Sequence, residues 1–232
     1  MSHIKNVCPV CNHLVTEVVY SLNKGDLKQC NHCDLIIFTP RPTPEELKAF
    51  YESDQYRKDY QNSPMTGETF AQQRYDQLNK VIAKYAPHIL TLKDKSLLDV
   101  GCGVGDLLKI ASQKEWEVTG TEISEAATKT ANKALGNKVI NGDILSLKLP
   151  PNSYDLITCY HVIEHLLDPI STLNKMLTLL KPNGVAFLET PNMGSLGAKI
   201  KGKNWSHITP PEHITYFNPS SLRYALDSAG FQ

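Results

Sequence analysis

The stretch Leu97–Leu108, which reads LLDVGCGVGDLL, decides the expected fold. Its apolar start predicts a buried parallel strand, and Gly101, Gly103 and Gly105 predict a tight turn that opens a helix. Because glycine lacks a Cβ, a ligand can approach this backbone closely, and the positive end of the next helix favours an anionic group, whether carboxylate or phosphate. We therefore expect a ligand to lie against this turn.

The spacing of the glycines separates two classes of ligand. A dinucleotide fold needs G-x-G-x-x-G, but Asp106 occupies the place of the third glycine, and Gly105 comes one residue early. The stretch instead resembles motif I of the class I S-adenosylmethionine (SAM) methyltransferases, hydrophobic-hydrophobic-D-x-G-x-G-x-G, with Asp99 as its acidic residue. The resemblance implies that SAM binds here, with Cys102 lining the methionine end.

The composition favours one α/β domain with a small appendage. At 232 residues, the chain has room for a domain of about 150 residues and little more. Basic and acidic residues number 24 each, so no overall field attracts nucleic acid or an anionic membrane. The sequence shows neither a membrane span nor a signal peptide. We expect a cytoplasmic protein with a small-molecule partner.

Four of the six cysteines form two CxxC pairs near the N-terminus, and they predict a zinc ribbon at 1–40. Two such turns at the ends of a β-hairpin present four thiolates to one ion. Four thiolates leave no open coordination position, so we expect the zinc to be structural. The charges of this segment cancel, which argues against phosphate binding. The expected ligands are Cys8, Cys11, Cys30 and Cys33.

Residues 41–95 are expected to form a helical linker and lid. Phe70–Tyr85 has apolar residues at helical spacing. In methyltransferases of this class, the segment before motif I often folds over the cofactor. That resemblance gives Tyr56, Tyr60 or Arg74 a binding role, although a solvated face with packed tyrosines explains the pattern equally well.

Acidic residues follow the next two predicted strands. Glu122 ends the second strand, where a carboxylate can accept hydrogen bonds from both ribose hydroxyls. The resemblance places Asp143 on the adenine amino group and Ile144 against the ring. The complete set expected to bind the cofactor is Asp99, Gly101, Cys102, Gly103, Gly105, Asp106, Glu122, Ile123, Asp143, Ile144 and His161.

The string His161-Val-Ile-Glu164-His165 follows the fourth predicted strand. Its order, H-x-x-E-H, is that of an inverted zincin site, but it stands at the end of a strand rather than within a helix. We therefore assign it to the acceptor site, because it resembles motif IV of small-molecule methyltransferases. There His161 lies nearest the reacting methyl group, and Glu164 and His165 shape the pocket floor.

Strands and helices alternate through 96–232, which predicts a doubly wound, mostly parallel, Rossmann-like methyltransferase sheet. A long loop, 193–212, is expected to wall the acceptor site. The family sheet has seven strands, but no residues follow the last helix to form strands six and seven. Either the sheet is truncated at its C-terminal end, or a rearrangement or another chain, as in a homodimer, covers the edge of strand five.

The pair Glu212–His213 introduces the last predicted helix. Together with the ribbon and the class I core, it is similar to bacterial sugar C-methyltransferases and related natural-product and cell-envelope enzymes. That resemblance implies that His213 is the base, that Glu212 orients it and that His161 positions the acceptor. Histidine suits this task because it titrates near neutral pH.

The expected function is therefore SAM-dependent methyl transfer to a small molecule, such as a nucleotide-linked sugar. Carbon, oxygen and nitrogen acceptors all stay open. Three alternatives also stay open: an rRNA base methyltransferase, against which the charge balance argues, an NAD-linked sugar enzyme, and a non-catalytic SAM-binding interaction module.

Overall fold

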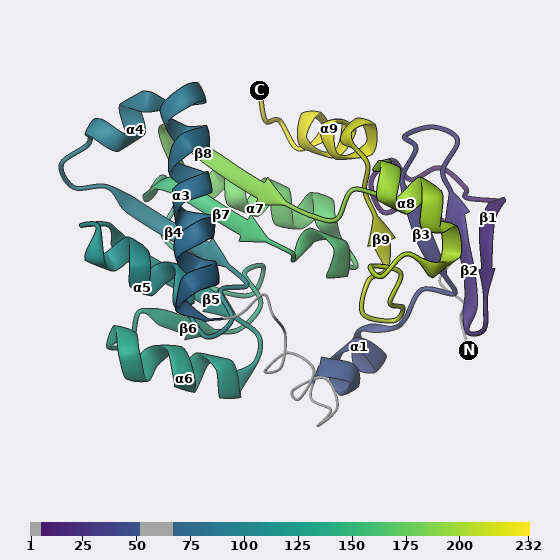
Figure 1. Ribbon diagram of the computed structural model, residues 1–232, viewed down its shortest axis with the longest axis horizontal. Coiled ribbons are helices and arrows are strands. Elements are labelled where there is room, and N and C mark those ends of the chain that lie inside the picture. Colours follow the sequence, from purple (N-terminus) through teal and green to yellow (C-terminus); the bar gives the residue numbers. More distant parts are fainter. Residues whose placement is uncertain (1–5, 52–66) are drawn as a thin grey trace. The chain divides into compact units, whose positions relative to one another are not determined.

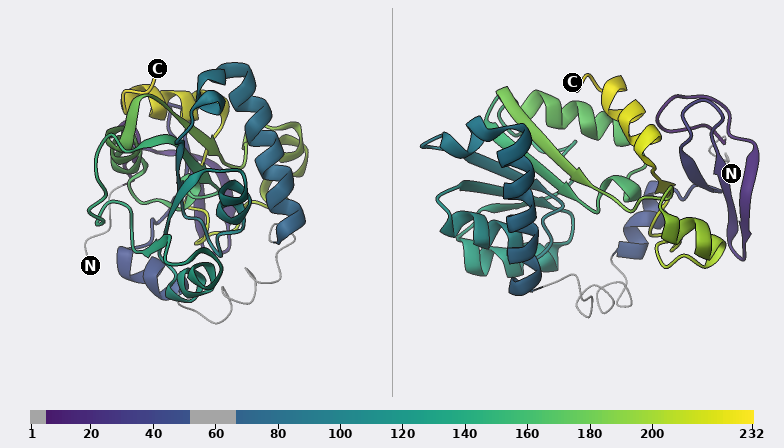
Figure 2. Two further views of the ribbon diagram at one scale, coloured as in Figure 1. Left: turned by 90° about the vertical axis from the view of Figure 1, so that its left-hand side faces the viewer. Right: turned by 45° about the horizontal axis from the view of Figure 1, so that its top comes forward.

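The computed structural model describes residues 6–51 and 67–232, and its contacts divide the chain into two compact units (Figures 1 and 2). Within the described residues, 67–160 and 175–188 form the first, called here the sheet unit. Residues 6–51, 161–174 and 189–232 form the second, called here the ribbon unit. The domain boundaries expected from the sequence stay a prediction.

The sheet unit contains the predicted five-stranded sheet, in the order β6-β5-β4-β7-β8. Neighbouring strands are parallel, with Leu97 of β4 opposite Val118 of β5 and Leu156 of β7. This order confirms the Rossmann-like methyltransferase sheet, and within the described residues no further strand extends it beyond β8. The strands are β4 (Ser96–Val100), β5 (Glu117–Glu122), β6 (Val139–Asn141), β7 (Tyr154–Tyr160) and β8 (Leu180–Glu189).

Helices pack on the sheet through apolar faces that follow the helical period. Tyr75, Leu78 and Ile82 of α3 share one hydrophobic core with Leu97 and with residues of α5, and α3 crosses in front of the sheet in Figure 1. All residues of β4 and β7 are buried, as expected of strands covered on both faces. The helices of this part are α3 (Glu68–Tyr85), α4 (Pro87–Thr91), α5 (Asp106–Gln113) and α6 (Glu125–Leu135), while α7 (Pro169–Leu179) begins in the ribbon unit and ends in the sheet unit.

The ribbon unit is built on a four-stranded sheet in the order β1-β2-β3-β9. The first two strands form the predicted hairpin and β3 extends it, but β9 comes from the far end of the sequence. It pairs antiparallel with β3, with Ile36 opposite Tyr216 and Ile37 opposite Thr215. The strands are β1 (Glu17–Leu22), β2 (Gly25–Gln29), β3 (Ile36–Thr39) and β9 (Thr215–Tyr216).

The 193–212 segment packs on this sheet. Met193, Ala198 and Trp205 share a hydrophobic core with Phe38 and Tyr216. Much of the segment is therefore ordered against the ribbon, and it includes one α-helix and one 3-10 helix. The other elements of the ribbon unit are α1 (Pro44–Tyr51), η1 (Ile163–His165), α8 (Leu196–Lys201), η2 (Gly202–Asn204) and α9 (Pro219–Ser228). Within the described residues, no helix is long and apolar enough to cross a bilayer.

Candidate functional site

The glycine turn joins β4 to α5 in a conformation that only glycine adopts readily. Gly101, Gly103 and Gly105 have φ angles of 70°, 57° and 78°. The amides of Gly101 and Cys102 donate to the carbonyl of Thr121, which ties the turn to β5. A Cβ at Gly105 would lie 2.8 Å from Leu135 Cδ1. The turn therefore needs its glycines both for the backbone path and for close packing.

Glu122, at the end of β5, is held against this turn by two backbone amides. Gly103 N donates to Oε2 at 2.9 Å, and Ser124 N donates to Oε1 at 2.7 Å. Burial raises the pKa of the Glu122 carboxyl, and these hydrogen bonds oppose the shift without cancelling it. Each carboxylate oxygen has a further lone pair, so two hydroxyl donors can be accepted by one rigid group.

Asp99 is buried at the end of β4 and accepts a hydrogen bond from the Thr158 hydroxyl at 2.7 Å. Burial raises the pKa of its carboxyl to about 7, although the Thr158 hydrogen bond and the charge of Arg74 both act to lower it. Near neutral pH, therefore, this carboxyl titrates beside the glycine turn.

Asp99 is expected to make the sheet unit less stable as pH rises. The pKa of Asp99 is raised on folding, so its contribution to the free energy of unfolding is fully present below about pH 4. That contribution is lost as pH rises to about 7, by at most about 1.4 kcal/mol per pH unit. Asn does not titrate, so the stability of wild type relative to Asp99→Asn should fall by about 2 kcal/mol between pH 5 and pH 7.5.

Urea unfolding of both proteins, followed by Trp116 fluorescence in a Trp205→Phe background, measures this difference. The histidines titrate in the same way in both proteins, so their effect on the free energy of unfolding cancels in the difference. A difference that does not change across this pH range would mean that Asp99 is already ionised at pH 5.

The other residues expected at the cofactor lie near the carboxyl ends of neighbouring strands. Asp143 follows β6, is exposed and accepts a hydrogen bond from Leu145 N at 2.9 Å, while Ile144 is buried. Ile123 is 54% exposed next to Glu122. Because these strands are parallel and adjacent, their ends form one edge of the sheet, where ligands of such folds bind.

Cys102 and Asp106 have partners within the sheet unit. A Cβ at Gly120 would lie 2.6 Å from Cys102 Sγ, so this thiol packs against β5. Burial raises the pKa of Cys102. Asp106, in the first turn of α5, accepts a hydrogen bond from Gly67 N at 3.1 Å and forms an ion pair with Lys109 at 2.8 Å.

Arg74 lies within α3, where its guanidinium stacks over two rings. It is 4.6 Å from the Phe70 ring centre and 4.7 Å from that of Tyr160. Its lid role stays a prediction. The other two lid residues expected from the sequence, Tyr56 and Tyr60, lie outside the described residues.

A second group of polar residues gathers in the ribbon unit around Glu164. This carboxylate is 1% exposed, accepts a hydrogen bond from Thr190 Oγ1 at 2.9 Å, and lies 3.3 Å from His161 Nδ1. The other ring nitrogen of His161 lies 3.2 Å from Glu189 Oε1. Burial acts to raise the pKa of Glu164, but the His161 hydrogen bond and the neighbouring histidines outweigh it and lower the pKa. His161 is thus fixed between two carboxylates.

His165 and His213 stand beside Glu164 with their rings 4.8 Å apart. Nδ1 of His165 lies 2.8 Å from the Glu212 carbonyl oxygen, and Nδ1 of His213 lies 2.7 Å from the His207 carbonyl oxygen. A carbonyl only accepts, so each Nδ1 carries a proton and donates it. Burial lowers the pKa of both histidines, so the neutral ring is favoured and its Nε2 holds a lone pair.

The group that fixes the His213 ring is thus a backbone carbonyl. Glu212 takes part through its own carbonyl, which orients His165. The orienting role of the Glu212 carboxylate stays a prediction. His207 was not singled out from the sequence, because no local pattern marks a residue whose contribution is its main-chain oxygen.

The ribbon sheet supports this histidine group through β9. Ile214 N donates to the Glu164 carbonyl at 3.0 Å, and Thr215 Oγ1 donates to the same oxygen at 3.2 Å. The Tyr216 hydroxyl donates to the His213 carbonyl at 2.9 Å. Because Thr215 and Tyr216 also pair with β3, the ribbon strands hold η1 and His213 in place.

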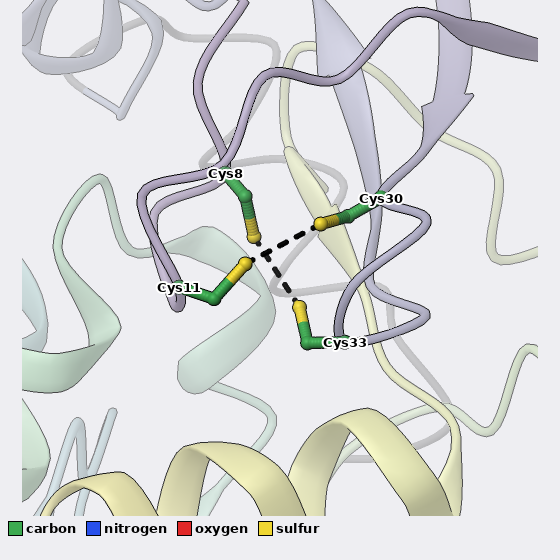
Figure 3. A group of neighbouring side chains, drawn as sticks. All are labelled: Cys8, Cys11, Cys30 and Cys33. Carbon is green, nitrogen blue, oxygen red and sulfur yellow. Dashed lines mark hydrogen bonds between the residues drawn. The ribbon is translucent and has the colours of Figure 1, made fainter.

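The four ribbon cysteines converge with their thiols free of disulfides (Figure 3). Cys8 and Cys33 sulfurs are 3.5 Å apart, and Cys11 and Cys30 sulfurs are 3.4 Å apart. In a tetrahedral site with zinc to sulfur distances of about 2.3 Å, sulfurs lie about 3.8 Å apart. The cluster therefore needs only a small expansion to hold a zinc ion, and it fits the predicted ribbon.

Comparison with known proteins identifies the family. A family profile described as a methyltransferase domain matches residues 70–232. This chain is a SAM-dependent methyltransferase. The match includes the glycine turn, Glu122, Asp143 and the segment from His161 to His213, so both groups of polar residues belong to the family region of the methyltransferase.

Relatives of this methyltransferase include two enzymes of the same name. Ubiquinone biosynthesis O-methyltransferase of Saccharophagus degradans is 33% identical over 167 residues, covering 67% of this chain and 71% of the relative. That of Coxiella burnetii is 34% identical over 166 residues, with the same shares. The crystal structure of a SAM-dependent methyltransferase from Archaeoglobus fulgidus is 25% identical, has a TM-score of 0.54, and is matched over 68% of this chain and 69% of its own.

The residues of the methyltransferase fit the cofactor of its family. The positive-φ glycines leave backbone uncovered by side chains, and Glu122 has acceptor capacity for a ribose diol. Which residue contacts which part of SAM stays a prediction from the motif.

Proposed function

We propose that this methyltransferase transfers the methyl group of SAM to a hydroxyl oxygen of a small molecule, and that His213 handles the proton of that hydroxyl. The observation that carries the assignment is the Nδ1 hydrogen bond to the His207 carbonyl, which leaves the lone pair of His213 on Nε2. The names of the relatives, O-methyltransferases at 33–34% identity, favour oxygen over carbon and nitrogen as the acceptor atom.

The sheet unit holds the cofactor in this proposal. The glycine turn approaches its methionine end, Glu122 accepts from the ribose hydroxyls, and Asp143 accepts from the adenine amino group. The four cysteines hold a structural zinc ion, which supplies folding free energy to a segment too small to fold on its own core.

The chain's residues orient the acceptor and remove its proton. Methyl transfer from a sulfonium is an in-line displacement, so alignment of the acceptor oxygen contributes most of the rate. A hydroxyl also needs a base, because its oxygen attacks as it loses its proton. His161, fixed between Glu164 and Glu189, positions the acceptor, and Nε2 of His213 takes the proton.

Two classes of acceptor are tested first. The resemblance noted in the sequence favours hydroxyls of nucleotide-linked sugars and of natural-product or cell-envelope intermediates. The names of the relatives add ring hydroxyls of quinone precursors. Both classes present hydroxyl groups on a rigid ring.

The test combines methyl transfer from radiolabelled SAM with calorimetric binding of S-adenosylhomocysteine. His213→Ala should lower turnover on the acceptor by at least about hundredfold, as for the loss of a general base, with its S-adenosylhomocysteine affinity unchanged within about threefold. His88→Ala is the matched control, because His88 is exposed on α4 and its ring bonds the Asn183 carbonyl, away from both groups of polar residues. Full turnover by His213→Ala, or methylation at carbon or nitrogen only, would contradict the proposal.

A further inference from the structure

The group around Glu164 contains three side chains of the kind that bind metal ions. Glu164, His165 and His213 each offer one ligand atom, and these atoms all lie within 4.8 Å of one another. Glu164 and His165 belong to η1, and His213 lies two residues before β9. Hydrogen bonds from Ile214 N and Thr215 Oγ1 to the Glu164 carbonyl hold these two segments together. The three side chains therefore meet through the fold and not through a local sequence motif.

The second ring nitrogen of each histidine is already engaged, as it is in metal sites. Metal-binding histidines almost always donate their other N–H to a carbonyl or carboxylate, which fixes the ring and leaves one lone pair for the ion. His165 does so to Glu212, and His213 to His207. Within the described residues, both rings form their hydrogen bonds through Nδ1, and Nε2 of each is left for an ion. The Thr190 hydroxyl donates a hydrogen bond to the Glu164 carboxylate and so fixes its orientation as well.

We propose that Glu164, His165 and His213 bind one divalent cation, separate from the zinc of the four cysteines. In a tetrahedral site with bonds of about 2.1 Å, ligand atoms lie about 3.4 Å apart, so closing this group requires each atom to move by less than about 1 Å. Two imidazoles and one carboxylate suit zinc or a neighbouring first-row metal.

The proposed ligand set differs from the H-x-x-E-H pattern set aside in the sequence. An inverted zincin needs its two histidines on one face of an α-helix, four residues apart. Here Ile163–His165 is a single 3-10 turn, and His161 faces Glu189 instead. Only Glu164 and His165 are shared with that pattern, and the third ligand is His213, which the sequence pattern does not include.

Three protein ligands leave coordination positions open, in contrast to the closed cysteine site. The inference rests on the proposed methyl transfer to a hydroxyl and changes its proton step: with an ion on Nε2, His213 is a ligand and no longer the base. The ion lowers the pKa of a coordinated hydroxyl, whose proton passes to water. The electron pair of that oxygen forms the new bond to the methyl carbon, and the pair of the broken carbon–sulfur bond stays on sulfur, which gives S-adenosylhomocysteine.

Open positions on the ion also define a substrate class. An acceptor with two neighbouring oxygens, such as a vicinal diol, can occupy two of them at once, and chelation fixes the reacting oxygen. Acceptors with a single isolated hydroxyl should be methylated at least about tenfold more slowly.

Metal content tests the inference without any acceptor. Purified wild type dialysed against Zn²⁺ should hold two equivalents by mass spectrometry, and His165→Ala and Glu164→Gln should each hold one. Glu164→Gln retains a side chain of the same shape, so it guards against loss of folding in the alanine variant. Co²⁺ added to protein with a zinc-loaded ribbon should give one equivalent of absorbing complex that lacks a thiolate band. His88→Ala should match wild type, and S-adenosylhomocysteine affinity should be equal in all four proteins.

The outcomes separate this inference from the proposed function. One zinc equivalent in wild type, with no uptake of Co²⁺, would overturn the metal site, and methyl transfer by that protein would leave the proposed function standing. A second equivalent that remains bound in both ligand variants would also overturn it. If a chelator removes the second ion while turnover persists, the ion has no part in proton removal. Parallel loss of the second ion and of turnover supports the inference.

Discussion

Glu122→Ala is expected to weaken the binding of S-adenosylhomocysteine by roughly hundredfold. The carboxylate is fixed by Gly103 N and Ser124 N, so its two oxygens are preorganised for a ribose diol. Hydrogen bonds to a charged acceptor contribute about 1.5 kcal/mol or more each, and losing two costs about 3 kcal/mol. Removal of the side chain also leaves the Gly103 amide without its partner, which loosens the turn.

Calorimetric titration measures this effect, and two further variants define its cause. Glu122→Gln retains one acceptor oxygen and should lose affinity by an intermediate amount. Glu125→Ala, three residues along, removes an exposed carboxylate that pairs with Lys129, and should leave the affinity unchanged. Equal affinity of Glu122→Ala and wild type would show that the ribose binds elsewhere.

Cys33→Ser is expected to abolish methyl transfer without affecting the binding of S-adenosylhomocysteine. If the four cysteines hold zinc as proposed, loss of one thiolate removes the ion, whose binding would supply much of the folding free energy of such a small segment. β3 begins three residues after Cys33 and pairs with β9, whose Tyr216 hydroxyl donates to the His213 carbonyl. Turnover should fall by at least about hundredfold, whereas the affinity of the sheet unit for S-adenosylhomocysteine should stay within about threefold.

The matched control is Asn31→Ser, which changes an exposed residue in the same CxxC turn and leaves all four thiols in place. Zinc content, turnover and S-adenosylhomocysteine affinity are measured on each protein. Normal turnover by Cys33→Ser protein that has lost its zinc would show that the ribbon does not hold the histidine group together.

The sheet could be predicted from the sequence because its signals are local. The apolar strand at Leu97, the positive-φ glycines and the acidic end of β5 each follow from a few adjacent residues. The cluster of four cysteines could also be predicted, because each CxxC pair forms one short local turn. These features need no information about distant parts of the chain.

The histidine group could be predicted only in part. Glu164, His165 and His213 were named from the sequence, but their meeting depends on β9, a strand of two residues with no pattern of its own. Likewise, the ring of His213 is oriented by a main-chain oxygen, which any residue at 207 would supply. Pairings and carbonyl contacts of this kind follow from the fold and leave no signature in residue type.

The pairing of β3 with β9 also limits how this enzyme can be divided. A chimera that exchanges residues 6–39 alone would place a foreign strand against the native Thr215–Tyr216, and the Tyr216 side chain shares a core with Phe38. The last strand of the ribbon sheet begins two residues after His213, so the ribbon and this distant segment must change together. Any exchange of acceptor specificity between relatives should therefore move the ribbon and the segment 205–217 as one unit.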